Sequence, residues 1–168
     1  LGNGTPIAAI IGKKEIMDCA QDTFISSTMW TERIGFIAAL ETLKKMKTKN
    51  VNNKIVKNGL YIKQKILYIS KKFGLNIDIK GMDSMPSFSF NYKNANELYT
   101  FFTQEMLSFG FLASNSMTLS FAHDKKTINK YLDRVEKTFK KIKQLIECKS
   151  AIPLRDVQRQ TNFTRLVK

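Results

Sequence analysis

The sequence predicts two folding units, an incomplete α/β sheet over residues 1–48 and a small α+β domain over residues 49–168. In the first unit, short apolar runs alternate with helical segments, which is the pattern of buried strands covered by helices. In the second unit, short segments of alternating apolar residues separate three amphipathic stretches, a pattern typical of an antiparallel sheet packed on helices. The first unit has too few strands for a complete sheet, so we expect the chain to be a fragment.

Each element of the first unit is short. Pro6 to Ile11 is an apolar run that follows a glycine-rich turn, and we expect it to form a buried strand. A short helix is expected from Lys13 to Gln21, and Asp22 to Ser27 contains the β-forming residues of a second strand. The next segment carries apolar side chains at helical spacing as far as Met46, with Thr31 as its expected N-cap.

The second unit starts after a polar break at residues 47–50. Val51 to Phe73 predicts a long amphipathic helix, because its apolar residues recur at helical spacing and Gly74 is a typical residue to follow a helix end. Asn76 to Lys80 and Ser87 to Tyr92 alternate apolar and polar residues, which indicates two half-buried antiparallel strands. These segments predict a helix followed by a pair of strands.

The remainder of the second unit repeats this order. A helix is expected from Ala95 to Phe109, followed by two short strands at Phe111 to Ala113 and Met117 to Ala122. Asp124 is the expected N-cap of a last long amphipathic helix. Residues 151–168 are polar and show no periodicity, so we expect them to form a tail.

The net charge of +14 raises the question of nucleic-acid binding. Lysine outnumbers arginine 23 to 5, whereas phosphate-reading surfaces favour the bidentate arginine fork. The ten lysines between Thr42 and Ile77 are interrupted by apolar residues at helical spacing, which is typical of solvated helix faces. We therefore do not expect nucleic-acid binding. A basic nucleic-acid-binding domain and a non-catalytic α+β domain stay open as alternatives.

Other function classes find little support in the composition. Cys19 and Cys148 lie far apart without metal-ligand spacing, and the single histidine, His123, has no partner at such spacing, so no metal site is expected. The longest apolar stretches are too short to span a bilayer. The first residues do not resemble a signal peptide. We expect a cytoplasmic protein with reduced thiols and no membrane partner.

Four blocks of sequence resemble, in the same order, the C-terminal part of class III aminotransferases of the glutamate-1-semialdehyde aminomutase kind. They are Leu1 to Ile7 with Gly12 to Met17, Ser27 to Met29 ahead of a helix, Leu119 to Asp124, and Phe163 to Leu166. The resemblance implies an enzyme that depends on pyridoxal 5'-phosphate, in which residues 1–48 end the large cofactor-binding domain and residues 49–168 form the small domain. The lysine that binds the cofactor is then expected about two residues before Leu1, so the chain alone is expected to be inactive.

The resemblance also implies a phosphate-binding site around Thr28. With Ser27 and Met29 beside it, Thr28 matches the family's threonine that reaches the cofactor of the neighbouring subunit, which implies a homodimer. A hydroxyl followed by amides at a helix N-terminus suits a dianionic phosphate. Without the resemblance, Ser27 and Thr28 fit ordinary helix-capping residues.

A second cofactor-binding segment is the loop that would follow the lysine. It consists of Gly2, Asn3 and Gly4, where glycine permits positive φ and a close approach of the backbone to the cofactor. A plain tight turn is the alternative for these three residues.

Two departures from the family pattern bear on the reaction. The aminomutase carries a glutamate near the substrate amine at the position of Asn115, and a neutral amide cannot pair with an ammonium as a carboxylate does. Thr31 to Arg33 replace the family's Gly-Asn-Pro. Both changes favour a transaminase, which moves an amino group from a donor to a keto or aldehyde acceptor, and the aminomutase stays as the alternative. We expect Asn115 and Trp30 to help shape the substrate pocket.

Overall fold

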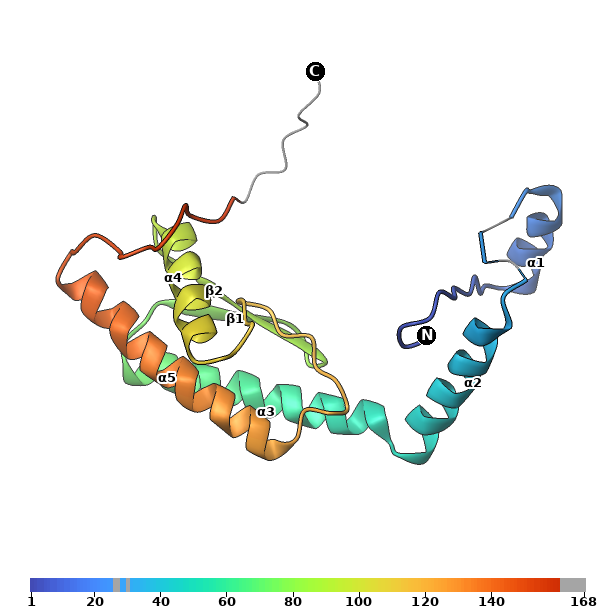
Figure 1. Cartoon of the computed structure of the whole chain (residues 1–168), viewed down its shortest axis with the longest axis horizontal. Helices are drawn as coiled ribbons and strands as arrows, with labels where there is room; N and C mark the ends of the chain where they lie inside the picture. The colour runs from blue at the N-terminus through green and yellow to red at the C-terminus, as the bar shows by residue number, and fades with distance from the viewer. Residues whose placement is uncertain (26–27, 30, 161–168) are drawn as a thin grey trace, which may run out of the picture. The chain divides into compact units, whose positions relative to one another are not determined.

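The chain is described by a computed structural model over residues 1–25, 28–29 and 31–160. It divides into two compact units, Leu1–Val51 (unit 1) and Asn52–Lys168 (unit 2), whose elements are labelled in Figure 1. Within the described residues, no helix is long and apolar enough to cross a membrane.

The described residues of unit 1 form two short helical pieces and one longer helix. The short pieces are α1 (Lys14–Met17) and the 3-10 helix η1 (Asp18–Asp22), which together cover the single helix expected near residues 13–21. The longer helix is α2 (Arg33–Thr48), which ends two residues beyond the expected Met46.

The two strands expected in unit 1 are not strands in the structure, so this prediction was wrong. The described residues of Pro6 to Ile11 and of Asp22 to Ser27 have no strand partner. Ile11 and Phe24 are 90% and 95% exposed. A strand exists only through hydrogen bonds to a neighbouring strand, and the part of the chain that the structure describes supplies none here.

The N-cap of α2 is Glu32 and not the expected Thr31. The amide of Glu32 donates to the Met29 carbonyl at 3.1 Å, which closes a turn just before the helix. One carboxylate oxygen of Glu32 then accepts from the amide of Ile34 at 3.5 Å. Because this turn sets the helix start at Arg33, Thr31 lies one residue too early to cap it.

Unit 2 combines three helices with one hairpin in its described residues. These are α3 (Val51–Lys72), β1 (Ile77–Met82), β2 (Met85–Phe90), α4 (Ala95–Ser108) and α5 (Lys125–Glu147). The two strands are antiparallel, with Ile77 opposite Phe90 and Met82 opposite Met85. The expected α+β architecture with a short antiparallel sheet is confirmed.

The core of unit 2 lies where the three helices gather around the hairpin (Figure 1). Phe88 of β2 meets Phe102 of α4 and Phe139 of α5 edge to face, with ring centroids 5.2 and 5.6 Å away. All three rings are at most 1% exposed. Helices α3 and α5 run side by side, where the Tyr61 hydroxyl donates to the side-chain oxygen of Asn129 at 2.9 Å.

The two further strands expected in unit 2, Phe111 to Ala113 and Met117 to Ala122, are not regular strands, and this prediction was also wrong. Residues 115–119 make two backbone hydrogen bonds with β2 and a third with Ser84 just before it, together with one isolated bridge. The amide of Met117 donates to the Pro86 carbonyl at 3.0 Å. Pro86 has no amide hydrogen to return a bond, so a regular ladder does not form there.

Two helix ends in unit 2 confirm the expected capping. The carboxylate of Asp124 accepts from the amide of Thr127 at 2.7 Å and so caps α5. Gly74 follows α3 with φ +59°, and the amide of Leu75 donates to the Ser70 carbonyl at 2.9 Å. Glycine adopts this left-handed conformation without steric cost.

The polar segment after α5 is tied to α4. The amide side chain of Gln104 donates to the Pro153 carbonyl at 3.0 Å and accepts from the Arg155 amide at 2.8 Å. The amide of Arg159 donates to the Thr100 hydroxyl at 2.9 Å. This segment therefore has a defined path as far as Arg159, although its sequence shows no periodicity.

Candidate functional site

Thr28 and Met29, two of the residues expected to bind the cofactor, line the same hollow in unit 1. Its volume is about 780 Å³. Its wall contains the side chains and backbone of Pro6, Ile7, Ala8, Ile10, Met17, Ile25, Thr28, Met29, Glu32, Gly35 and Phe36. The wall is mainly apolar, with the hydroxyl of Thr28 and the carboxylate of Glu32 as its polar side-chain groups. Such a surface suits an aromatic ring with a polar substituent.

The surroundings of Thr28 differ in one respect from those expected. Thr28 and Met29 lie in a turn, and α2 begins only at Arg33, so the amides directly after Thr28 do not belong to the helix. The carboxylate of Glu32 occupies the N-terminal end of α2. A phosphate at Thr28 would therefore bind the hydroxyl and turn amides rather than the end of the helix dipole.

The loop expected after the cofactor lysine is a tight turn. The Gly2 carbonyl accepts from the amide of Thr5 at 3.3 Å and from its hydroxyl at 3.0 Å. The two central residues have positive φ, +47° at Asn3 and +110° at Gly4. Asparagine and glycine are the residues that tolerate this geometry, so the sequence of the turn matches its shape.

The structure does not bring this turn to the hollow at Thr28. Gly2 and Asn3 line a separate surface against the later part of α2, between Ala38 and Lys49. In the wall of the Thr28 hollow, Gly35 of α2 lies against Pro6, and a methyl group added at Gly35 would be 2.9 Å from the Pro6 carbonyl oxygen. The sequence did not single out Gly35, and its only signal is a glycine inside an apolar helical pattern.

Asn115, expected near the substrate, lies in unit 2 and is half-buried. Its amide nitrogen donates to the Phe88 carbonyl at 3.0 Å, and its backbone carbonyl accepts from the Phe88 amide at 3.0 Å. Its side-chain oxygen accepts from the guanidinium of Arg159 at 3.2 Å. Asn115 therefore fixes β2 and the C-terminal segment. Counting only partners among the described residues, one amide hydrogen and one oxygen lone pair of its side chain are left.

Three other predictions fall on residues that the structure does not describe. Ser27 and Trp30 lie outside the described residues, and so does the block from Phe163 to Leu166.

His123 has a structural role in the described part of unit 2. Its Nδ1 accepts from the amide of Ser120 at 2.9 Å, and its carbonyl accepts from the side chain of Asn58 at 2.9 Å. The first bond closes the turn before α5, and the second joins this turn to α3. The described residues contain no group of three or more His, Cys, Asp or Glu side chains that could hold a metal ion.

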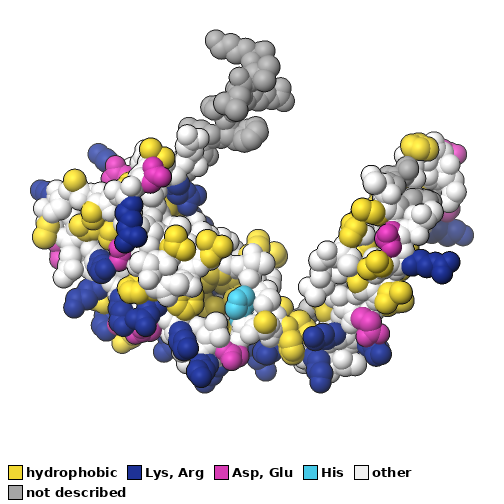
Figure 2. Space-filling view, in the orientation of Figure 1, with side chains coloured by type: hydrophobic (Ala, Val, Ile, Leu, Met, Phe, Trp, Pro, Cys, Tyr) yellow, Lys and Arg dark blue, Asp and Glu magenta, His cyan; other side chains and the backbone are white. Residues whose placement is uncertain are grey.

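The basic residues of unit 2 do not gather in one stripe on the face that Figure 2 shows, where acidic side chains lie between them. Several lysines pair with acids. The distance from the Lys63 ammonium to the Asp83 carboxylate is 2.7 Å, and that from Lys137 to Asp133 is 3.1 Å. This mixed surface differs from a continuous phosphate-binding groove.

The chain is similar to aminomutases and aminotransferases among the known proteins. No family model matches the chain. It is 27% identical over 161 residues to a glutamate-1-semialdehyde 2,1-aminomutase of Fusobacterium nucleatum, a match that covers 84% of this chain and 37% of the relative. It is 27% identical over 88 residues to the aminopentol aminotransferase of Sphingopyxis macrogoltabida, which covers 52% of this chain and 21% of that enzyme.

A solved structure gives the fold. The chain matches the pyridoxal phosphate internal aldimine form of the FumI protein of Sphingopyxis sp. MTA144 with a TM-score of 0.77 and 22% identity. The match covers 87% of this chain and 36% of that protein. This chain thus has the fold of part of that protein, and it spans little more than a third of the length of FumI and of the aminomutase from Fusobacterium nucleatum. The resemblance predicted from the four sequence blocks is confirmed.

Proposed function

We propose that this chain is the C-terminal part of a class III aminotransferase that depends on pyridoxal 5'-phosphate and transfers an amino group from an amino donor to a keto or aldehyde acceptor. The observation that carries the proposal is the match of 87% of the chain, at a TM-score of 0.77, to a protein whose structure contains this cofactor. The relatives in sequence, aminomutases and aminotransferases, point to the same chemistry.

The exposed apolar residues of unit 1 support a larger parent protein. Ile10 and Ile11 are 68% and 90% exposed, and Ile37 and Leu40 on α2 are 63% and 68% exposed. Soluble proteins seldom leave so many large apolar side chains uncovered. In the proposal, the remaining part of the enzyme covers these residues, and residues 1–48 end its large domain.

The hollow at Thr28 fits part of a cofactor site. When bound, pyridoxal phosphate supplies an electron sink for reactions at the carbon that bears the amino group. Thr28 offers one hydroxyl to the phosphate, and the apolar side chains of Ile7, Met29 and Phe36 offer surface for the ring. A phosphate dianion needs several donors, so other residues of the enzyme complete the site. Ser27 belongs to the same proposed site.

Thr28 is exposed on unit 1, which supports a role across a subunit interface. In the proposed homodimer its hydroxyl donates to the phosphate of the cofactor in the neighbouring subunit. Gly2, Asn3 and Gly4 form the turn that follows the cofactor lysine, which is expected about two residues before Leu1. The tight geometry of this turn would hold the chain close to that lysine.

A glutamate-1-semialdehyde aminomutase is the second candidate. Aminomutases align with 84% to 87% of the chain, whereas the aminotransferases align with 51% to 58%. Against this stands Asn115, which lacks the charge to hold a substrate ammonium. Asn115 and Trp30 are proposed to shape the substrate pocket, in which the free amide hydrogen of Asn115 would face a carbonyl or hydroxyl of the substrate.

The experiment is a spectrum of the full-length protein. We expect visible absorbance from the cofactor imine, its loss after borohydride reduction, and a modified lysine just before Leu1 in the peptide map. In a separate, unreduced sample, addition of amino donors such as glutamate should convert the visible band to that of the amine form. A protein without this absorbance, even after addition of pyridoxal phosphate, would contradict the proposal. Salt-sensitive binding to duplex or single-stranded nucleic acid would favour the nucleic-acid alternative instead.

The two candidate reactions can be told apart by the substrates that each requires. A transaminase converts an added keto or aldehyde acceptor together with an amino donor. An aminomutase converts glutamate-1-semialdehyde alone, without a donor. Turnover of the semialdehyde as the sole substrate would therefore replace the transaminase proposal with the mutase.

A further inference from the structure

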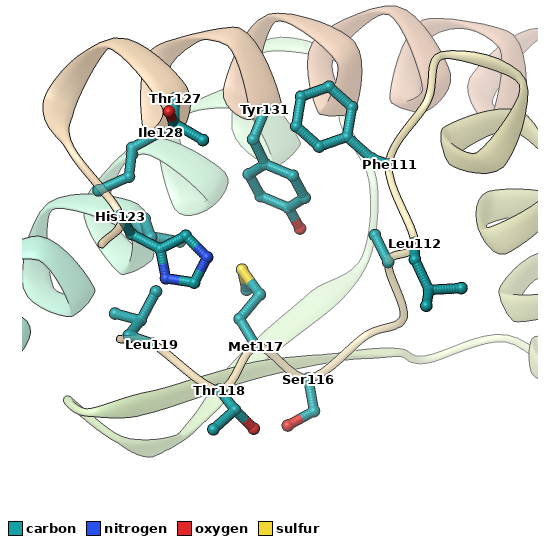
Figure 3. Close-up of a pocket in the computed structure, with 12 residues that line it drawn as sticks. Phe111, Leu112, Ser116, Met117, Thr118, Leu119, His123, Thr127, Ile128 and Tyr131 are labelled. Carbon is teal, nitrogen blue, oxygen red and sulfur yellow. The ribbon is translucent and has the colours of Figure 1, made fainter. Parts of the chain in front are cut away.

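The guanidinium of Arg159 lies beside Asn115, the residue proposed to shape the substrate pocket. Its Nη1 donates to the side-chain oxygen of Asn115 at 3.2 Å, and one face of the group lies over the Tyr99 ring, 4.6 Å from the ring centre. The segment that carries Asn115 passes beside the hairpin, as its neighbours Ser116 and Met117 show in Figure 3. Two side chains from separate parts of unit 2 therefore set the orientation of this cation.

Both of these side chains are themselves held in place by β2. The amide nitrogen of Asn115 donates to the Phe88 carbonyl at 3.0 Å, and the Tyr99 hydroxyl accepts from the Phe90 amide at 3.0 Å. Neither side chain can turn away from the guanidinium of Arg159 without losing its own hydrogen bond. The guanidinium is therefore supported by groups that are already fixed, which lowers the entropic cost of holding it ready for a ligand.

The C-terminal segment has anchors that do not use this charge. The side chain of Gln104 donates to the Pro153 carbonyl at 3.0 Å and accepts from the Arg155 amide at 2.8 Å. The backbone amide of Arg159 donates to the Thr100 hydroxyl at 2.9 Å. The guanidinium adds to these three bonds, but a neutral side chain at position 159 would keep all of them. The path of the segment therefore does not require a charged group at this position.

The guanidinium of Arg159 has donors left for an anion. Among the described residues, no carboxylate pairs with Arg159. A guanidinium has five N–H donors in a planar fork, and the bond to Asn115 uses one of them. The remaining edge, with Nε and Nη2, matches the two oxygens of a carboxylate. Because Arg159 is exposed, this edge is accessible to a ligand.

The charge at this place selects the kind of ligand. A cation beside Asn115 repels an ammonium group and attracts an anion. The other two groups that contact the guanidinium, the amide of Asn115 and the ring of Tyr99, are neutral. A phosphate dianion needs several charged or strong donors, whereas a carboxylate monoanion is matched by one guanidinium fork. The site therefore suits a carboxylate.

We propose that Arg159, held by Asn115 and Tyr99, determines specificity in the amino-transfer reaction by binding a carboxylate of the substrate, so that the amino donor is an amino acid. This inference rests on the proposed function. A bidentate pair with the guanidinium fixes both the position and the direction of the substrate. The remaining amide hydrogen of Asn115 then faces an oxygen of the same substrate.

The first test follows the conversion of the visible cofactor band by amino donors in the full-length enzyme. The probes are alanine, β-alanine and 4-aminobutyrate, each compared with its own uncharged amide. We expect at least one carboxylate to react about tenfold or more faster than its amide at low donor concentration. In Arg159→Met that carboxylate should lose about tenfold or more of its rate, in keeping with the loss of hydrogen bonds to a charged group. The rate with the amide should change by less than about twofold.

The division between KM and kcat separates binding from a general structural effect. The loss in Arg159→Met should appear as a higher KM for the carboxylate with little change in kcat, as expected when a binding contact is removed. Arg159→Lys keeps the charge without the planar fork and should retain part of the preference. Arg155→Met removes the same charge from the same segment and should retain all of it, because Arg155 contacts Gln104 through its backbone amide.

A second measurement needs neither cofactor nor turnover. Propionate, and not propionamide, should shift the Nε–H signal of Arg159 in the NMR spectrum of the full-length protein and leave that of Arg155 in place. The proposal is overturned if no carboxylate is preferred over its amide, if Arg159→Met slows both members of a pair alike, or if propionate shifts both arginine signals equally. Equal conversion of the cofactor band by acids and amides would leave the proposed function intact, whereas a protein without cofactor absorbance would refute that function itself.

Discussion

Gly59 of α3 lies against the backbone of Asp83 at the tip of the β1–β2 hairpin. A methyl group built on Gly59 would be 1.5 Å from the Asp83 carbonyl oxygen and 2.7 Å from its carbonyl carbon. One turn further along α3, the ammonium of Lys63 donates to the Gly81 carbonyl and to the Asp83 carboxylate, both at 2.7 Å. The hairpin tip is therefore held against α3 by one close backbone contact and one half-buried cation.

We expect Gly59→Ala to destabilise unit 2 by about 2–3 kcal/mol or more, because helix and turn must separate to admit the methyl group. Alanine favours a helix by about 0.5–1 kcal/mol over glycine, so the steric effect must exceed this gain. Urea unfolding of the protein measures the difference. Gly12→Ala is the matched control, because the nearest atom there is the flexible Met17 sulfur at 3.2 Å. A Gly59→Ala protein as stable as the unmodified one would contradict the close contact.

The cap of α5 predicts a dependence on pH. The hydrogen bond from the Thr127 amide holds the pKa of Asp124 below its ordinary value of 3.8. Because the pKa is lower in the folded state, the stabilisation is complete above the unfolded pKa and is lost as pH falls through the folded pKa. Asp124→Asn keeps an acceptor oxygen at the cap but cannot titrate.

We therefore expect the stability of the unmodified protein, relative to Asp124→Asn, to fall as the pH is lowered from about 5 to about 2. Asp124→Ala should be less stable than the unmodified protein at neutral pH and approach it at the acid end. Urea unfolding at a series of pH values measures both differences. A difference that stays constant across the acid range would show that the cap does not favour the charged carboxylate.

The sequence predicted unit 2 well because its helices bury their apolar faces within the chain. Phe102 and Phe139, from the stripes of two helices, meet in its core, and Asp124 and Gly74 act at the helix ends as their residue types suggest. Local pattern and tertiary packing agree here. Residues 115–119 were harder to predict, because the irregular pairing follows from Pro86, a residue of the neighbouring strand.

Unit 1 was predicted less well for a different physical reason. Pro6 to Ile11 has the composition of a buried strand, but the described residues supply no neighbouring strand for it. Composition can show that a segment suits burial, and it does not show which segment covers it. Within the part of the chain that the structure describes, the buried Tyr131 hydroxyl has no hydrogen-bond partner. The sequence could not predict this, because a tyrosine on the apolar stripe of a helix gives no sign of where its oxygen points.

The C-terminal segment supplies a further prediction. The guanidinium of Arg159 donates to Asn115 at 3.2 Å and lies 4.6 Å from the centre of the Tyr99 ring. We expect Arg159→Met to lower the free energy of opening of residues 152–159 by about 1–2 kcal/mol, since it removes both interactions. Hydrogen exchange measured by mass spectrometry reports this opening. Arg155→Met is the control, because Arg155 donates its hydrogen bond to Gln104 from the backbone amide, which the substitution keeps, and its exchange should stay near that of the unmodified protein.

The last prediction concerns Thr28 in the full-length enzyme. If its hydroxyl donates to the cofactor phosphate, Thr28→Val should weaken pyridoxal phosphate binding about tenfold or more, because a hydrogen bond to a charged group contributes about 1.5–3 kcal/mol. Thr28→Ser keeps the hydroxyl and should retain most of the affinity. Thr23→Val is the matched control, since its hydroxyl donates to the Ala20 carbonyl at 2.9 Å within unit 1.

The same variant tests whether Thr28 binds the cofactor of the neighbouring subunit or that of its own subunit. In a mixed dimer, one subunit carries Thr28→Val and the other lacks the cofactor lysine. If Thr28 serves the neighbouring subunit, the lysine that remains faces an intact Thr28, and the one functional site binds cofactor with normal affinity. If Thr28 serves its own subunit, the site with the lysine lacks the threonine hydroxyl and binds weakly. The affinity for the cofactor, measured from the visible absorbance as cofactor is added, distinguishes the two cases. Unchanged affinity in the Thr28→Val homodimer would exclude a phosphate role for this residue.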